Sequence, residues 1–245
     1  MTTTLITGAN KGIGYETARR LVEAGHTVYV GARNAERGRR AAEEVGARFV
    51  LLDVTDDASV EAAANTIEAD GGLDVLINNA GIESRTADNS VPTAETVTAD
   101  QMRNTFETNV FGVVRVLHAF LPLLRRSAAP VVVNVSSGLA SLTALSDPDH
   151  PAHFYPGIAY PTSKTAVNML TVQFAKAFPD MRINSDGPQA LPPPRCSSRL
   201  QRTPVRSGTS TPEPARTLPA VTSAAASPVP HPSKPPRPSA DPYAP

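Results

Sequence analysis

The sequence predicts one α/β domain with a doubly wound parallel sheet over residues 1–185. Short apolar runs of strand length alternate with longer segments that have helical periodicity. Small or polar residues follow these runs, where ligand crevices lie in parallel sheets. A glycine-rich turn joins the first run to the first helical segment. These observations indicate a ligand site along the carboxyl ends of the strands.

The first strand is expected at residues 3–7, and residues 15–24 have the amphipathic spacing of a helix. Between them, Gly8 permits a tight turn, Gly12 lets the backbone approach a ligand, and Gly14 allows close packing. The free N–H groups of the helix start favour a pyrophosphate. The alternative is a plain glycine-rich connection. The predicted ligand contacts in this turn are Gly8, Asn10, Lys11, Gly12, Ile13 and Gly14.

A basic residue follows the second predicted strand, residues 27–30. At Arg33, a site for NADH would usually have an acidic residue that binds the ribose hydroxyls. Together with Lys11, Arg33 can bind a 2′-phosphate, which favours NADPH over NADH. The alternative is that both are solvated surface cations.

The next two predicted strands also end in polar residues. Residues 48–52 run into Asp53 and Val54, where Asp53 can accept a hydrogen bond from an adenine amino group or simply shape the turn. A helix start is expected at residues 55–59. Residues 73–77 lead into a small polar segment, Asn78-Asn79-Ala80-Gly81.

A long helix is predicted from Asp100 to Arg126, with Asn109 interrupting its apolar face. A buried amide needs partners, and these are either neighbouring backbone groups or a water near Lys164 that Asn109 organises. A fifth strand at residues 131–135 then delivers Ser136 and Ser137, and a hydroxyl there can reach a substrate oxygen.

Tyr160 and Lys164 are four residues apart, on one face of a predicted helix. The ammonium group near the phenol would favour its phenolate form and lower its pKa from the ordinary value of about 10. The alternative is a solvated pair of the kind that many helices carry.

In this order and spacing, the motifs resemble those of the classical short-chain dehydrogenase/reductases, with a particular similarity to NADPH-dependent carbonyl reductases. The motifs are Thr7-Gly8-x-x-x-Gly12-x-Gly14, Leu52-Asp53-Val54, Asn78-Asn79-Ala80-Gly81, Asn109, Asn134-Val135-Ser136-Ser137 and Tyr160-x-x-x-Lys164. The resemblance covers about residues 2–185. It implies a Rossmann fold, an NADPH cofactor and hydride transfer to a ketone or aldehyde.

The resemblance also implies a catalytic tetrad. Tyr160 would protonate the carbonyl oxygen, Ser137 would orient and polarise it, and Lys164 would lower the pKa of Tyr160 and bind the nicotinamide ribose. Asn109 would support a proton relay through water. Ser137 is chosen over Ser136 by the family's usual placement. The implied cofactor contacts include Asp53, Val54, Asn79, Tyr160 and Lys164.

Two other functions remain open. One is a catalytically silent NADP-binding protein, because the family's Pro-Gly turn, substrate lid and last strand are not found after residue 185. The other is a sugar-nucleotide epimerase or dehydratase, which the glycine spacing and the Asn-Asn-Ala-Gly segment disfavour. No hydrolase or kinase motif occurs. His150 and His153 lack a third ligand, so a solvated loop is expected there and no metal.

Residues 186–245 have a different composition. They hold 16 of the chain's 24 prolines, no Ile, Phe or Met, and one aromatic residue, Tyr243. A segment that can bury so little is expected to be disordered or extended. It is either a natural Pro-, Ser- and Ala-rich extension or, as we favour, the product of a reading-frame shift near codon 186. Translating the other frames of the gene tests this, and finding no Pro-Gly turn followed by helix and strand patterns would contradict it.

The overall charge is balanced, with 23 Lys and Arg against 23 Asp and Glu, and no basic face or motif predicts a nucleic-acid partner. We expect no membrane segment, no leader and a cytoplasmic location. The single Cys196 predicts no internal disulfide. The expected partners are a small carbonyl or alcohol substrate and a second copy of the chain in a homodimer.

Overall fold

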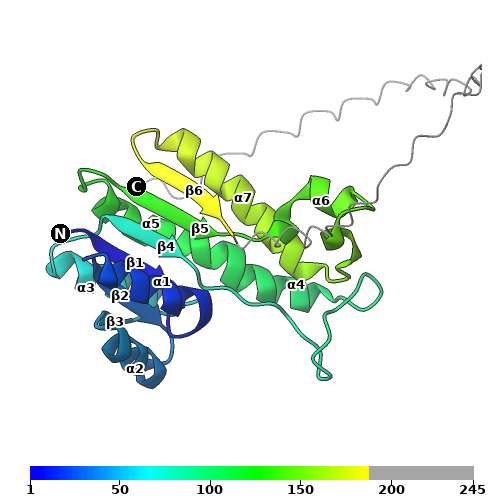
Figure 1. Ribbon diagram of the computed structural model, residues 1–245, viewed down its shortest axis with the longest axis horizontal. Helices are drawn as coiled ribbons and strands as arrows, with labels where there is room; N and C mark the ends of the chain where they lie inside the picture. Colours follow the sequence, from blue (N-terminus) through cyan, green and yellow to red (C-terminus); the bar gives the residue numbers. More distant parts are fainter. Residues whose placement is uncertain (188–245) are drawn as a thin grey trace, which may run out of the picture. The chain divides into compact units, whose positions relative to one another are not determined.

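A computed structural model describes residues 1–187 and contains a parallel sheet of six strands in the order β3-β2-β1-β4-β5-β6 (Figure 1). The order reverses direction between β1 and β4, which places a topological switch point at their carboxyl ends. The predicted doubly wound Rossmann-like fold is confirmed. The strands are β1 (Thr3–Thr7), β2 (Thr27–Ala32), β3 (Arg48–Leu51), β4 (Val75–Asn78), β5 (Val131–Val135) and β6 (Arg182–Asp186).

Helices cover both faces of the sheet (Figure 1). On one face, Leu5 and Leu76 lie in a cluster with residues of α3, α5 and α7. On the other face, Ile6 and Ile77 pack with residues of α1 and α2. This alternation follows from the two-residue repeat of a strand and explains the nearly continuous apolar runs. The helices are α1 (Gly12–Glu23), α2 (Ala35–Val45), α3 (Asp57–Ala69), α4 (Ala99–Phe106), α5 (Gly112–Leu124), α6 (Leu142–Ser146) and α7 (Ala159–Ala177).

The predicted helix over residues 100–126 is not a uniform α-helix. A π-helical segment, η1 (Glu107–Phe111), separates α4 from α5, and the predicted interruption at Asn109 lies inside it. By length and composition, the stretch Ala99–Leu124 would qualify as a membrane span. Its most apolar window is 50% buried, and α4, η1 and α5 contact α7 or α3, as expected of a core helix.

Two parts of the chain differ from what the sequence predicts. The segment between Ser137 and Ala159, expected to be a solvated loop, contains the short helices η2 (Gly138–Ala140), α6 and η3 (Pro151–Phe154). Residues 182–186 pair in parallel with β5, so the sheet continues through the point where the resemblance was expected to end. The expected disorder and the proposed frame shift concern a segment that, apart from residues 186 and 187, lies outside the described residues.

Candidate active site

The turn between β1 and α1 forms an open backbone cradle. Gly8 has φ +66°, and a Cβ there would lie 2.9 Å from the Cα of Ala80. Gly12 has φ +62°, and a Cβ there would meet no atom within 4 Å. Lys11 occupies the N-cap of α1 and makes no side-chain capping bond. The first N–H groups of α1 are therefore available to an anion, which fits the phosphates of a dinucleotide.

Asn79, at the end of β4, fixes this turn. Its Nδ2 donates hydrogen bonds to the Thr7 oxygen at 2.9 Å and to the Gly8 oxygen at 3.2 Å. A Cβ on Gly14 would lie 2.4 Å from the same Nδ2, so α1 can approach only because residue 14 is glycine. Gly14 therefore has the predicted packing role, while Asn79 supports the cradle.

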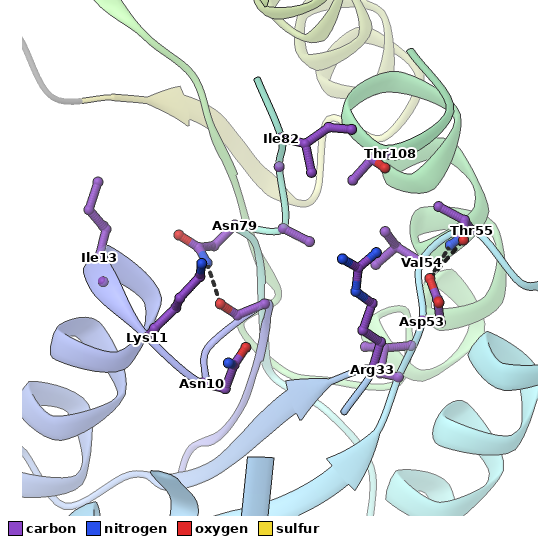
Figure 2. Close-up of a pocket in the computed structure, with 15 residues that line it drawn as sticks. Asn10, Lys11, Ile13, Arg33, Asp53, Val54, Thr55, Asn79, Ile82 and Thr108 are labelled. Carbon is purple, nitrogen blue, oxygen red and sulfur yellow. Dashed lines mark hydrogen bonds between the residues drawn. The ribbon is translucent and has the colours of Figure 1, made fainter. Parts of the chain in front are cut away.

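A pocket of about 370 Å³ opens above this cradle (Figure 2). Figure 2 shows Lys11 and Arg33 approaching it from opposite walls. Asp53 lies at the far end, where its Oδ1 accepts hydrogen bonds from the Thr55 backbone N–H at 3.0 Å and from the Thr55 hydroxyl at 2.8 Å. The predicted cofactor residues that line this pocket are Gly8, Asn10, Lys11, Gly12, Ile13, Arg33, Asp53, Val54 and Asn79.

A second pocket of about 360 Å³ contains Tyr160 and Lys164. Ile13, Asn79, Gly81 and Ile82 line both pockets, so the two adjoin. A dinucleotide in the first pocket would reach Tyr160 across these shared residues. The two groups of sequence-predicted residues thus belong to one continuous site.

Lys164 is buried in α7, with an exposed fraction of 5%. Its Nζ donates to the Val135 carbonyl at 2.7 Å and lies 5.8 Å from the centroid of the Tyr160 ring. Burial lowers the pKa of Lys164 to about 8. The ammonium group is thus directed to the end of β5 and lies over the ring face of Tyr160.

The pKa of Tyr160 is raised, mainly because burial disfavours the phenolate. The Ser137 hydroxyl acts in the lowering direction, and the negative charge of Glu83 raises the pKa further. The sequence predicted a lowered pKa from Lys164 alone. In the structure the pKa of Tyr160 is raised instead, because desolvation by the surrounding residues outweighs the hydrogen bond with Ser137.

Asn109 is fully buried in η1 and uses its whole amide group. Its Oδ1 accepts from the Ile82 N–H at 2.8 Å, and its Nδ2 donates to the Ile82 carbonyl at 2.8 Å and to Ser163 Oγ at 3.0 Å. The Ser163 hydroxyl in turn donates to the Tyr160 carbonyl at 2.7 Å. Asn109 therefore connects the segment after β4 to the first turn of α7, which supports the backbone-satisfaction alternative.

The two serines after β5 have different surroundings. Ser136 is buried and donates to Asn168 Oδ1 at 2.6 Å, so its hydroxyl holds α7 against the sheet. Ser137 is half-buried, caps η2 by accepting from the Leu139 N–H at 3.2 Å, and acts on Tyr160. Ser136 lines the second pocket and Ser137 does not, but the Ser136 hydroxyl is bonded to Asn168 whereas Ser137 acts on Tyr160, which favours the choice of Ser137.

Several residues of the site were not singled out in the sequence. Ser163 connects Asn109 to Tyr160, Glu83 lines the second pocket and accepts from the Tyr155 hydroxyl, and Thr108 lines the first pocket. Only Ser163 had a local signal, because it lies between Tyr160 and Lys164. The others come together through contacts between distant parts of the chain.

Among residues 1–187, no three His, Cys, Asp or Glu side chains are grouped to bind a metal. The two loop histidines have local partners. His150 Nδ1 accepts from the Ala152 N–H at 3.1 Å, and His153 Nδ1 lies 2.9 Å from the Leu145 carbonyl oxygen.

Comparison with known proteins identifies the family. The model of the short chain dehydrogenases matches residues 2–189. The chain belongs to this family. Its members are oxidoreductase enzymes that bind a nicotinamide cofactor. The open cradle at the start of α1 and the two cations beside it fit such a cofactor.

Known members of the family align with most of the described chain. The short-chain dehydrogenase anuI of Penicillium roqueforti is 37% identical over 179 residues, which span 68% of this chain and 69% of that protein. The (-)-isopiperitenone reductase of Mentha piperita is 32% identical, and the alignment covers 74% of this chain and 81% of that protein. The structure of a gluconate 5-dehydrogenase from Burkholderia cenocepacia J2315, in complex with NADP and tartrate, superposes with a TM-score of 0.62 at 28% identity, covering 76% of this chain and 70% of that chain.

Proposed function

We propose that the protein reduces a ketone or aldehyde to an alcohol with NADPH as the hydride donor. The observation that carries the proposal is the position of Tyr160 and Lys164 in a pocket that adjoins the dinucleotide cradle. The (-)-isopiperitenone reductase among the relatives supports the reductive direction.

Four residues have separate roles in the proposed reaction. When bound, the reduced nicotinamide supplies the hydride. Tyr160, whose raised pKa keeps it protonated at neutral pH, donates the proton to the carbonyl oxygen. Ser137 orients that oxygen by hydrogen bonding, and Lys164 binds the nicotinamide ribose from the side of β5. Asn109 holds the start of α7, and with it Tyr160, in place through Ser163.

The preference for NADPH rests on two cations. Lys11 and Arg33 line the same pocket, and Arg33 follows β2 at the position where an acidic residue would bind ribose hydroxyls. A 2′-phosphate between a lysine and an arginine gains charge-assisted hydrogen bonds. The NADP complex of the gluconate 5-dehydrogenase supports the same assignment.

The alternative is an NADP-binding protein without catalytic activity. It is supported by the family match, which ends at residue 189 of 245, and by relatives of which 69% to 81% is covered. Such a protein would bind the cofactor but would not turn over a carbonyl substrate.

A fluorescence titration with NADPH and, in parallel, NADH separates these proposals. We expect saturable binding that favours NADPH and a preference that is lost in Arg33→Asp. The matched control is Arg103→Asp, which makes the same charge change at an exposed residue of α4 paired with Asp100. Oxidation of NADPH by aldehydes and ketones that is abolished in Tyr160→Phe supports the reductase. Binding without turnover on any of them supports the silent protein, and no binding contradicts both.

We also infer a homodimer through η1, α5 and α7. Exposed apolar side chains lie on these elements, namely Phe111, Val114, Met169 and Val172. Light scattering of the full chain should give twice the monomer mass, and Phe111→Lys with Met169→Lys should give the monomer mass. A monomeric wild-type protein would contradict this.

A further inference from the structure

We propose that Arg115 positions the adenine end of the cofactor site by holding the turn after β3 against the π-helical segment η1. The inference rests on the proposed cofactor binding and concerns a residue that touches neither pocket. It assigns a functional reason to a cation in the first turn of α5, where the sequence suggests only a surface charge.

The Arg115 guanidinium uses all three of its nitrogens on two segments, the turn from β3 into α3 and η1. Nη1 donates to the Val54 carbonyl at 2.6 Å, Nε to Asp57 Oδ1 at 2.6 Å, and Nη2 to Glu107 Oε1 at 3.0 Å. Its side chain has an exposed fraction of only 19%. The side chains of Asp57 and Glu107 are 80% and 42% exposed, so solvent screens these two ion pairs, whereas Val54, whose carbonyl accepts the third bond, is 7% exposed.

Both segments that Arg115 holds are walls of the cofactor pocket. Val54 lines the pocket, and its carbonyl is the acceptor for Nη1. Thr108 lines the same pocket and directly follows Glu107, the acceptor for Nη2. Figure 2 shows Val54 and Thr108 at the same end of the pocket. Arg115 therefore joins the turn after β3 to η1 beside this end of the pocket and fixes the position of Val54 relative to Thr108.

The absence of a side chain at Gly112 allows Val54 to pack closely against the start of α5. A Cβ on Gly112 would lie 2.9 Å from Val54 Cγ2 and 3.3 Å from the Val54 oxygen. Val54 is thus packed against the start of α5 while Arg115, on the same turn, holds its carbonyl. Because Val54 is packed on Gly112 and hydrogen-bonded by Arg115, both in the first turn of α5, this end of the pocket is formed before the cofactor binds, which reduces the ordering cost of binding.

A lysine at residue 115 cannot make all three of these hydrogen bonds in the same geometry. The planar guanidinium presents its donors in a fixed fork, whereas an ammonium group is one compact point charge. An Arg115→Lys variant can satisfy one or two of the three acceptors and would leave the others without a donor. We expect it to lie between the wild type and Arg115→Gln.

The test is cofactor affinity in the full chain, with a control from the same helical region. Arg115→Gln should raise the dissociation constant for NADPH and for 2′,5′-ADP about tenfold, as expected when charged hydrogen bonds are lost. Reduced nicotinamide mononucleotide, which lacks adenine, should bind as it does to the wild type. In turnover, KM for NADPH should rise while kcat at saturation is retained. The control Arg126→Gln removes an arginine just after α5 that pairs with Glu68 at 2.6 Å, and it should leave all three affinities unchanged.

Two results would overturn the inference. The first is an Arg115→Gln protein that binds NADPH within twofold of the wild type. The second is an equal loss of affinity for reduced nicotinamide mononucleotide, which would indicate general destabilisation. If Arg115→Gln does not fold, Arg115→Lys takes its place with a smaller change in the same pattern. A wild-type chain that binds no cofactor overturns the proposed function and this inference together. That outcome is visible in the wild type alone, before any variant is measured.

Discussion

Lys164 combines a functional position with an energetic cost. Burial lowers its pKa from 10.5 to about 8, so the unfolded chain binds more protons than the folded chain between these values. Folding stability from this group therefore rises as the pH increases from about 8 to 10.5, and below pH 8 the full cost remains. At its proposed catalytic position, buried Lys164 thus lowers the free energy of unfolding at neutral pH.

We expect Lys164→Met to be more stable than the wild type at pH 7. The gain should be about 1–2 kcal/mol, because each pKa unit corresponds to roughly 1.4 kcal/mol and the bond to the Val135 carbonyl is lost. The difference should shrink as the pH approaches 10.5. Urea denaturation at several pH values measures it, with the exposed Lys176→Met on the same helix as control. A variant less stable than the wild type at every pH would contradict the argument.

The Glu83 carboxylate adds to the effect of burial, the larger cause of the raised pKa of Tyr160. Its negative charge raises the pKa of Tyr160, so Glu83→Gln should lower that pKa while the Gln side chain still accepts from Tyr155. The proposed reduction requires the protonated phenol, so activity should be lost as the pH rises through the pKa of Tyr160. The alkaline limb of the pH profile should therefore move to lower pH. Glu95→Gln, in the exposed segment before α4, is the control, and an unmoved alkaline limb would refute the role of Glu83.

At the level of elements, the contact between α1 and β4 depends on the absence of a side chain at residue 14. Gly14→Ala would place a methyl group 2.4 Å from Asn79 Nδ2. Overpacking of this kind costs about 1–3 kcal/mol, and we expect Tm to fall by roughly 2–10 °C. NADPH affinity should fall as well, because Asn79 holds Thr7 and Gly8. Calorimetry with Arg20→Ala, an exposed position on α1, as control measures the effect, and an unchanged Tm would show that α1 can shift without loss.

The elements were predictable where the signals are local. The strands β1 and β5 have the expected bounds, and the glycine turn and the helix of Tyr160 follow from their own residues. The partners of Asn109 were not predictable, because Ile82 and Ser163 lie 27 and 54 residues away and an amide does not specify its partners. The same holds for Arg115, which in the sequence resembles any helical surface cation. Long-range contacts thus decide how the predicted residues are oriented.

For the whole molecule, cofactor binding should appear as stabilisation. A ligand that binds only the folded chain at 100 times its dissociation constant adds about 2.7 kcal/mol to the free energy of unfolding. For a domain of this size, that corresponds to an increase in Tm of roughly 5–10 °C. At equal concentration NADPH should raise Tm more than NADH, and Arg33→Asp should remove the difference. Equal shifts with both cofactors in the wild type would contradict the assigned preference.

The π-helical segment η1 has a consequence for how this chain can change. Each residue in an α-helix turns the backbone by about 100°. If one residue of Glu107–Phe111 were deleted to restore regular α-helix, α4 would rotate by that angle relative to α5. Either Asn109 would leave Ile82, or α4 would turn its buried Thr105 away from Ser84. Single-residue deletions should therefore be tolerated at the surface turns around this helix but not within it.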